Sequence, residues 1–168
     1  MAKGDNGVNP QEAVDKYADM VYRLALLQVK NKSDADDVFQ EVFVRLVRHA
    51  DRLENMEHAK AWLIKVTLNC ARKHFASYWN RNVYPVDEME EVAVEESGFE
   101  RAERDSSVMA AVRRLSPKYR SVIHLFYYEE LTVGEIAKVT GIKEATVKSQ
   151  LSRAREMLKD MLKGEISL

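Results

Sequence analysis

Part of this sequence carries polar side chains whose types and spacing suit contacts with nucleic acid. Between residues 58 and 81 there are five basic residues and no acid, whereas an ordinary exposed surface mixes the two signs. Lys and Arg neutralise phosphates, and the amide of Asn offers both a donor and an acceptor that can read the edge of an unpaired base. Residues spaced 4, 3 and 1 apart lie on one side of a helix. Those on this side are Lys65, Asn69, Arg72 and Lys73.

Three aromatic residues flank this basic strip, namely Trp62, Tyr78 and Trp79. Aromatic rings can stack on unpaired bases, but they also fill cores. Core packing is favoured for Trp62, and both alternatives remain open for Trp79. The strip itself has a plainer alternative, in which Asn69 is simply a solvated polar residue.

A second stretch, residues 131–158, has the spacing of a helix-turn-helix. Thr132 and Glu135 form the sequence pattern of a capping box, which predicts a short helix over 132–140. Gly141 supplies a turn where a left-handed backbone is expected. Ala137 is small where two helices must cross closely. A second helix is then predicted over 144–163.

On that second helix the apolar residues predict a buried stripe of Val147, Leu151, Ala154, Leu158 and Met161. The side chains left facing outward or sideways are Glu144, Lys148, Ser149, Ser152, Arg153 and Arg155. Such a face suits a DNA groove, because basic groups contact phosphates or guanine and hydroxyls reach bases or backbone. The alternative is a solvated charged face on an ordinary helical hairpin, which would leave the turn glycine and crossing alanine unexplained.

A further amphipathic helix is predicted to start at Ser33, with Ser33 as its cap and Asp36 three residues on. Its apolar stripe is Ala35, Val38, Phe39, Val42, Phe43 and Leu46. The opposite face presents Asp37, Gln40, Glu41, Val44, Arg45 and Arg48. A face of this kind is commonly just solvated, but an apolar residue inside a charged rim also suits docking on a protein.

The elements that position these residues are predicted to be helices throughout, since Gly and Pro total nine and apolar alternation is absent. The predicted fold is all-α, with two small helical lobes joined by an acidic flexible linker, the second lobe containing the helix-turn-helix. Residues 83–104 carry two basic and eight acidic residues, which predicts this linker between lobes at 1–82 and 105–168. The other predicted helices span about 10–30, 58–81, 105–115 and 117–128, the last with Ser116 as cap and Pro117 in its first position.

Composition excludes several classes of protein. The single cysteine, Cys70, excludes an internal disulfide framework and paired-cysteine zinc sites, and a small buried apolar role is favoured for it. The four histidines fall on separate predicted helices, and none is paired with a carboxylate at metal-ligand spacing. We therefore expect no catalytic residues, no metal and no cofactor. Without a signal peptide or a long apolar run, the chain is expected in the cytoplasm, with no membrane insertion.

The order of these parts resembles a bacterial extracytoplasmic-function (ECF) sigma factor of the sigma-70 family, over about residues 10–82 and 105–163. The D-x-x-Q-E-x-F core of the family is matched by Asp37, Gln40, Glu41 and Phe43. Its W-L-x-x-x-x-x-N pattern is matched by Trp62, Leu63 and Asn69. The carboxyl-terminal motif matches almost throughout, from LSPKYRSVIHLFYYEEL to SRAREML.

The resemblance implies a DNA-binding transcription initiation factor with core RNA polymerase and promoter DNA as partners, and an anti-sigma factor as a further candidate partner. It assigns polymerase docking to the outer face of the helix from Ser33, and minus-35 recognition to the outer face of the helix over 144–163. It assigns minus-10 recognition to the basic strip. The loop at 51–57 adds weaker minus-10 candidates, Arg52, Asn55 and Met56. Nucleotidyl transfer would belong to the polymerase, so this chain is not expected to be an enzyme.

Two departures from the family pattern stand out. Lys143 occupies the place where Ser is common, so the last helix lacks its usual cap. Tyr127 and Tyr128 stand where Arg or Leu is commoner. Two rival functions remain: a stand-alone regulator that dimerises through its amino-terminal lobe and binds operator DNA, and an interaction module such as an anti-anti-sigma decoy or small helical adaptor. The acid-free strip argues against the second rival.

Overall fold

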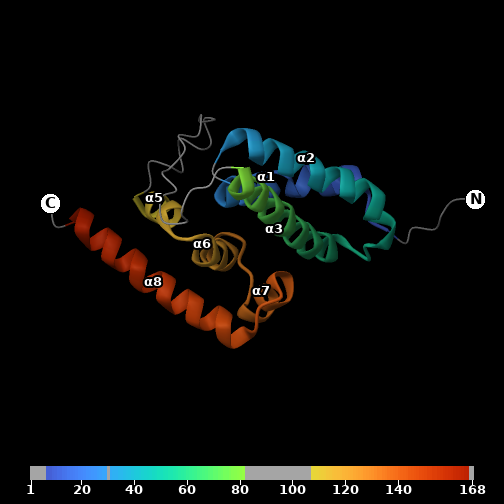
Figure 1. The fold of residues 1–168 in the computed structure, drawn as a ribbon. Coiled ribbons are helices and arrows are strands. Elements are labelled where there is room, and N and C mark those ends of the chain that lie inside the picture. The colour runs from blue at the N-terminus through green and yellow to red at the C-terminus, as the bar shows by residue number, and fades with distance from the viewer. Residues whose placement is uncertain (1–6, 30, 82–106, 167–168) are drawn as a thin grey trace, which may run out of the picture. The chain divides into compact units, whose positions relative to one another are not determined.

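The computed structural model describes residues 7–29, 31–81 and 107–166, without the side chains of 75–81, 165 and 166 (Figure 1). All regular elements in these ranges are helices, which confirms the predicted all-α class. The chain divides into two compact units, whose described parts are 7–81 and 107–166. The predicted acidic linker at 83–104 lies outside the described residues.

Unit 1 is a bundle of α1 (Pro10–Val29), α2 (Lys32–His49) and α3 (Met56–Arg81), with a 3₁₀ turn, η1, at Ala50–Arg52. Each of the three α-helices packs against the other two. Leu24, Leu46 and Leu63 are fully buried, one from each helix. Burying apolar area of this kind stabilises the bundle by about 25 cal/mol per Å², and it holds α2 and α3 with one face each toward solvent.

The start of α2 differs from the prediction. Its N-cap is Asn31, whose Oδ1 accepts a hydrogen bond from the Asp34 backbone N–H at 2.8 Å. The Asn31 amide in turn donates to Asp34 Oδ2 at 2.7 Å. Ser33 therefore lies inside the first turn, and the prediction that it caps the helix was wrong. Asn is at least as favourable as Ser at the N-cap position of a helix. Here the Asn31 amide also has an acceptor in the Asp34 carboxylate, three residues later.

Unit 2 contains α5 (Ser107–Arg114), α6 (Pro117–Ile123), α7 (Val133–Thr140) and α8 (Glu144–Ile166). Contacts with α5, α6 and α7 make α8 the common packing partner. The predicted helix over 117–128 is not a single α-helix, since it becomes a π-helix, η3, at His124–Tyr128. Ser116 does occupy the N-cap position with Pro117 following, but the serine side chain makes no capping hydrogen bond.

A buried arginine joins two elements of unit 2. The guanidinium of Arg120 on α6 donates to the backbone oxygens of Arg113 and Leu115, at 3.2 and 2.9 Å. The Arg113 carbonyl lies in the last turn of α5 and the Leu115 carbonyl lies just after it, so neither has a hydrogen-bond partner within the helix. The Arg120 side chain therefore satisfies two acceptors that burial would otherwise leave unpaired. Burial, and then the nearby charge of Arg113, lower the pKa of Arg120 to about 10. The guanidinium therefore stays charged at neutral pH.

Candidate nucleic-acid interface

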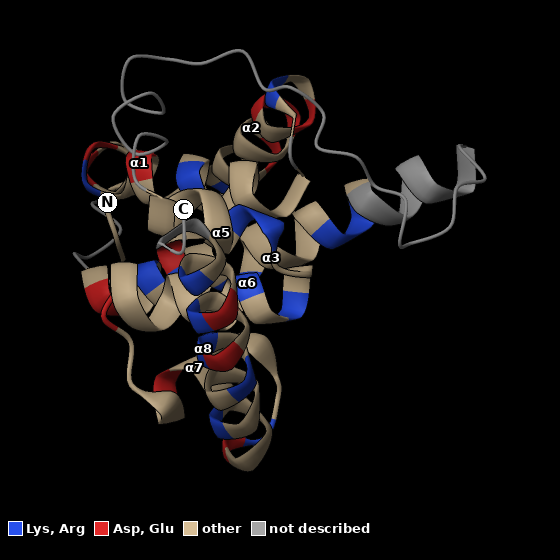
Figure 2. Cartoon of the chain, turned by 90° about the vertical axis from the view of Figure 1, so that its left-hand side faces the viewer, with Lys and Arg blue, Asp and Glu red and all other residues tan. Residues whose placement is uncertain are grey.

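The basic strip of unit 1 lies on the solvent side of α3. All four members are exposed, while Leu63, Ile64 and Ala71 on the same helix are buried. Lys and Arg colour much of this visible part of α3 blue (Figure 2). The arrangement places Asn69 between Lys65, one turn before it, and Arg72, one turn after it. An amide flanked by two cations can pair with a base edge while its neighbours hold phosphates.

Of the three aromatic side chains beside the strip, the structure describes that of Trp62. Trp62 is half-buried, and its ring stacks on that of His49 with centroids 4.9 Å apart and 7° between the planes. This contact joins α3 to the end of α2 and agrees with the packing role favoured for Trp62. The side chains of Tyr78 and Trp79 lie outside the described residues.

The turn between α2 and α3 is held by its own hydrogen bonds. Asn55 is exposed, and its Oδ1 accepts from the His58 backbone N–H at 2.8 Å, which caps α3. The Tyr17 hydroxyl donates to the Met56 carbonyl at 3.0 Å and ties this turn to α1. Two of the three weaker minus-10 candidates thus have structural contacts, whereas Arg52 is exposed on η1.

The outer face of α2 is less uniform than its sequence pattern predicted. Asp37, Gln40, Val44 and Arg48 are exposed, with Val44 at 51%. Glu41 and Arg45 are only half-exposed, and they form an ion pair at 2.7 Å. The other Glu41 oxygen lies 3.8 Å from His74 Nε2 on α3. Glu41 therefore also lies against α3.

One exposed apolar residue near this face was not among the candidates. Val47 is 66% exposed and follows Val44 by one helical turn, so the pair extends the apolar part of the face. Its spacing was the signal that could have found it. Cys70 is buried as expected; burial, followed by the charge of Glu41, raises the pKa of its thiol.

Among the described residues, Asp34, Asp37 and His74 bring possible metal-ligand atoms within 4.8 Å of one another. The sequence did not predict this proximity, because His74 comes from α3 and the two carboxylates from α2. Asp34 already accepts from Asn31, and His74 lies near Glu41, so part of this group is engaged within the protein.

The helix-turn-helix of unit 2 has the predicted turn chemistry. Thr132 Oγ1 accepts from the Glu135 backbone N–H at 3.1 Å, and Glu135 Oε1 accepts from the Thr132 N–H at 3.0 Å. Gly141 has φ +73°, in the left-handed region, and its N–H donates to the Ala137 carbonyl. The capping box thus begins α7, and Gly141 ends it before the chain turns into α8.

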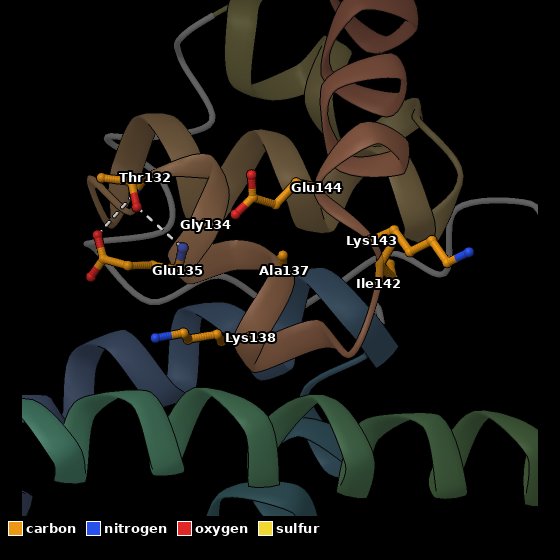
Figure 3. A pocket seen from close by; sticks show the side chains of 8 residues that line it. All are labelled: Thr132, Gly134, Glu135, Ala137, Lys138, Ile142, Lys143 and Glu144. Carbon is orange, nitrogen blue, oxygen red and sulfur yellow. Dashed lines mark hydrogen bonds between the residues drawn. The ribbon is translucent and has the colours of Figure 1, made fainter.

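A hollow lies where α7 meets the start of α8, and Figure 3 shows the side chains around it. Glu144 reaches toward α7, with Oε1 only 3.2 Å from where a Cβ on Gly134 would lie. Because Glu144 is exposed, a Cβ at position 134 would require only a small shift of its carboxylate. The helix begins at Glu144 despite the missing serine, since the Val147 N–H donates to the Lys143 carbonyl at 3.0 Å.

The predicted recognition face of α8 is solvent-exposed. Val147, Leu151 and Ala154 are buried beneath it, while Leu158 and Met161 are half-buried. Four of the outward residues, Lys148, Ser149, Ser152 and Arg153, lie together over the first turns. Arg155 is also exposed, but its Nε donates to the Tyr127 hydroxyl at 2.7 Å. No pattern in the sequence indicated this contact.

Comparisons with known proteins agree with both halves of this description. The Sigma-70 region 2 family matches residues 13–81, and the Sigma-70, region 4 family matches residues 106–158. No helix in the described ranges is both long enough and apolar enough to cross a membrane.

Two relatives come from Bacillus subtilis (strain 168). RNA polymerase sigma factor SigV is 30% identical over 144 residues, which cover 86% of this chain and 85% of SigV. ECF RNA polymerase sigma factor SigM is 30% identical over 156 residues, covering 88% of this chain and 91% of SigM. Sigma factor RpoE from Bartonella quintana, solved with the anti-sigma factor NepR, has a similar fold, with a TM-score of 0.74 and 22% identity over 91% of this chain and 96% of RpoE. By its motifs, its helices and these relatives, this chain belongs to the ECF RNA polymerase sigma factors.

Proposed function

We propose that this chain directs core RNA polymerase to a two-part promoter and helps to initiate transcription there, with minus-10 recognition by unit 1 and minus-35 recognition by unit 2. The observation that carries the proposal is the match of regions 2 and 4 to separate compact units, each with an exposed basic face on the expected helix. A protein that contacts two DNA elements needs two such faces.

In unit 1 the proposal gives the outer face of α2 to polymerase docking. The exposed valines, Val44 and Val47, offer apolar area, and the exposed charge of Asp37 offers a polar contact at the rim. Asn69 on α3 then reads an unpaired base of the minus-10 element. Lys65, Arg72 and Lys73 hold the adjacent phosphates, and Arg52 and Asn55, both exposed in the turn, are further candidates.

In unit 2 the first turns of α8 enter the major groove of the minus-35 element. Lys148, Ser149, Ser152 and Arg153 supply the donors that reach base edges and phosphates. Glu144, exposed at the first residue of α8, is a further minus-35 candidate, since its carboxylate can accept from a base amino group.

The proposal includes three further points. The acidic segment at 83–104 joins the two units and follows a basic path on the polymerase, since eight carboxylates would be repelled by DNA. The chain acts in the cytoplasm without catalysing a reaction, as nucleotidyl transfer belongs to the polymerase. An anti-sigma factor is a candidate partner, supported by the similar fold of RpoE in its complex with NepR.

The test is transcription by the purified chain and bacterial core polymerase from a library of random-sequence promoters. We expect enrichment of templates with two short elements at fixed separation, and none with core polymerase alone. When the chain alone is used to pull down DNA from the same library, a stand-alone operator-binding regulator would instead enrich palindromic half-sites. An interaction module would enrich no DNA, and either result would reject the proposal.

A further inference from the structure

Tyr127 and Arg155 form an exposed polar pair that links η3 to α8. The hydrogen bond from Arg155 Nε to the Tyr127 hydroxyl oxygen is 2.7 Å long, and Tyr127 remains 52% exposed. The guanidinium carbon also lies 5.4 Å from the Phe126 ring centroid and 5.6 Å from that of Tyr127. A long, flexible cation is thus held against two rings.

Tyr127 belongs to the π-helix η3. The Glu129 N–H donates to the His124 carbonyl at 3.1 Å, an i to i+5 hydrogen bond that inserts one residue into the turn. His124 and Tyr128 stack one turn apart, with centroids at 5.6 Å. Tyr127 lies within this wide turn, and its hydroxyl meets Arg155 of α8. Such insertions occur often at functional sites.

The pair keeps its capacity to bind an anion. A guanidinium has five N–H donors, and this hydrogen bond uses only the one on Nε, so the four on the Nη atoms can form a fork toward phosphate. The Tyr127 hydroxyl acts as acceptor in the bond and retains its own O–H donor. A guanidinium already held in place loses less side-chain freedom when it binds.

The position of Arg155 indicates which part of DNA it would meet. Lys148, Ser152, Arg155 and Lys159 follow one another at spacings of 4, 3 and 4, so they form one stripe along α8, and all four are exposed. Arg155 lies about 10 Å further along the helix axis than Lys148. The major groove is about 12 Å wide, so a helix that enters by its first turns brings Arg155 to the backbone at the groove edge.

We propose that Tyr127 and Arg155 form a preassembled contact for a DNA phosphate beside the minus-35 element, in which Tyr127 is the positioning residue for the guanidinium. This inference rests on the proposed minus-35 role of unit 2. It also gives a function to Tyr127, one of the two departures from the family pattern.

The test compares Tyr127→Phe, Arg155→Ala and the double variant with the parent chain, each as holoenzyme with core polymerase. The probe is a duplex fragment carrying the two-element promoter enriched in the transcription assay, and its dissociation constant is measured over a range of salt concentrations. Losing one charge-assisted phosphate contact in Arg155→Ala should weaken binding about tenfold. It should also lower the slope of log affinity against log salt by about one.

Tyr127→Phe removes only the hydroxyl, so it should weaken binding by a smaller factor, and this effect should vanish when Arg155 is already Ala. That non-additivity distinguishes positioning from an independent contact. Tyr119→Phe, which removes a tyrosine hydroxyl from α6, is the matched control and should bind like the parent chain.

Three outcomes would overturn the inference. If Tyr127→Phe lowers the thermal unfolding midpoint but leaves affinity and salt slope unchanged, the pair is only a brace between η3 and α8. If the two single effects add, Tyr127 does not act through Arg155. If Arg155→Ala relaxes preference at one base, Arg155 reads a base instead of binding phosphate. Failure of the parent holoenzyme to depend on the minus-35 sequence would reject the proposed function instead.

Discussion

Asn69 is the residue whose chemistry leads to the sharpest prediction at the scale of single side chains. It is exposed between basic neighbours on α3. Asn69→Ala should remove the amide while leaving the cations, so discrimination at one minus-10 base should fall by about 1–3 kcal/mol. The measurement is transcription from promoters varied one base at a time, with polymerase binding followed in parallel. Gln11→Ala, which truncates an exposed amide on α1, is the control. An unaltered preference profile for Asn69→Ala would reject its role as a base reader.

The docking face leads to a second residue-scale prediction. Asp37 and Glu41 both lie near His74, but Asp37 is exposed, whereas Glu41 is half-exposed and forms an ion pair with Arg45. Reversing Glu41 would therefore disturb unit 1 itself, so Asp37→Lys is the cleaner test. It should weaken binding to core polymerase by about 1.5–3 kcal/mol if a charge-assisted contact is lost, with the thermal midpoint unchanged. Asp19→Lys, an exposed reversal on α1, is the control. Equal affinities for the two variants would contradict the docking assignment.

At the scale of elements, a comparison of two glycines separates the effect of backbone conformation on stability from the effect of packing. A Cβ added at Gly141 or at Gly164 would have no other atom within 4 Å, but of the two residues only Gly141 has a positive φ. Gly141→Ala should cost about 1–2 kcal/mol because a Cβ disfavours the left-handed backbone. Gly164→Ala, in the last turn of α8, should stabilise by at most about 0.5 kcal/mol, since glycine weakens a helix, though less at its end than in its middle. Urea unfolding of both variants measures the difference. Effects of the same sign would show that the backbone conformation at Gly141 does not decide the outcome.

The junction of α5 and α6 depends on Arg120. Arg120→Met keeps most of the side-chain volume but removes the donors to the Arg113 and Leu115 carbonyls. Burying acceptors without partners costs about 1–3 kcal/mol, although the Nε and Nη2 atoms that already lack partners in this structure offset part of the loss. We expect a lower midpoint for unit 2 in thermal unfolding. Arg114→Met, an exposed change at the end of α5, should have little effect. A midpoint for Arg120→Met equal to that of the parent would show that these hydrogen bonds add nothing.

For the molecule as a whole, the two compact units predict separate unfolding. Cys70 is buried in unit 1 and is the single cysteine of the chain, so its labelling by a thiol reagent reports on that unit alone. Burial and Glu41 raise the pKa of this thiol, which lowers the reactive thiolate fraction further. Native chain should therefore label slowly, at a rate that Arg120→Met in unit 2 leaves unchanged. Faster labelling of that variant would show that the units unfold together.

Much of this architecture follows from short-range patterns. The apolar period of α2, the capping box at Thr132 and the left-handed turn at Gly141 each depend on residues within about one helical turn, so the sequence alone predicted them correctly. The cap of α2 was assigned to Ser33 instead of Asn31 because several residues with capping side chains occur in a row. The residue-level contacts with polymerase and promoter remain predictions.

Contacts between elements were decided only by the tertiary structure. The α1 tyrosine that bonds to Met56, the approach of Glu144 to Gly134 and the hydrogen bond from Arg155 to Tyr127 join residues 10 to 39 positions apart. Helical periodicity specifies which face of a helix is buried, but it carries no information about which residue of another element lies opposite. The π-helix at 124–128 shows the same limit. Its apolar pattern did not distinguish its hydrogen-bond register from that of an ordinary α-helix. In the folded chain, η3 packs against α6 and α7.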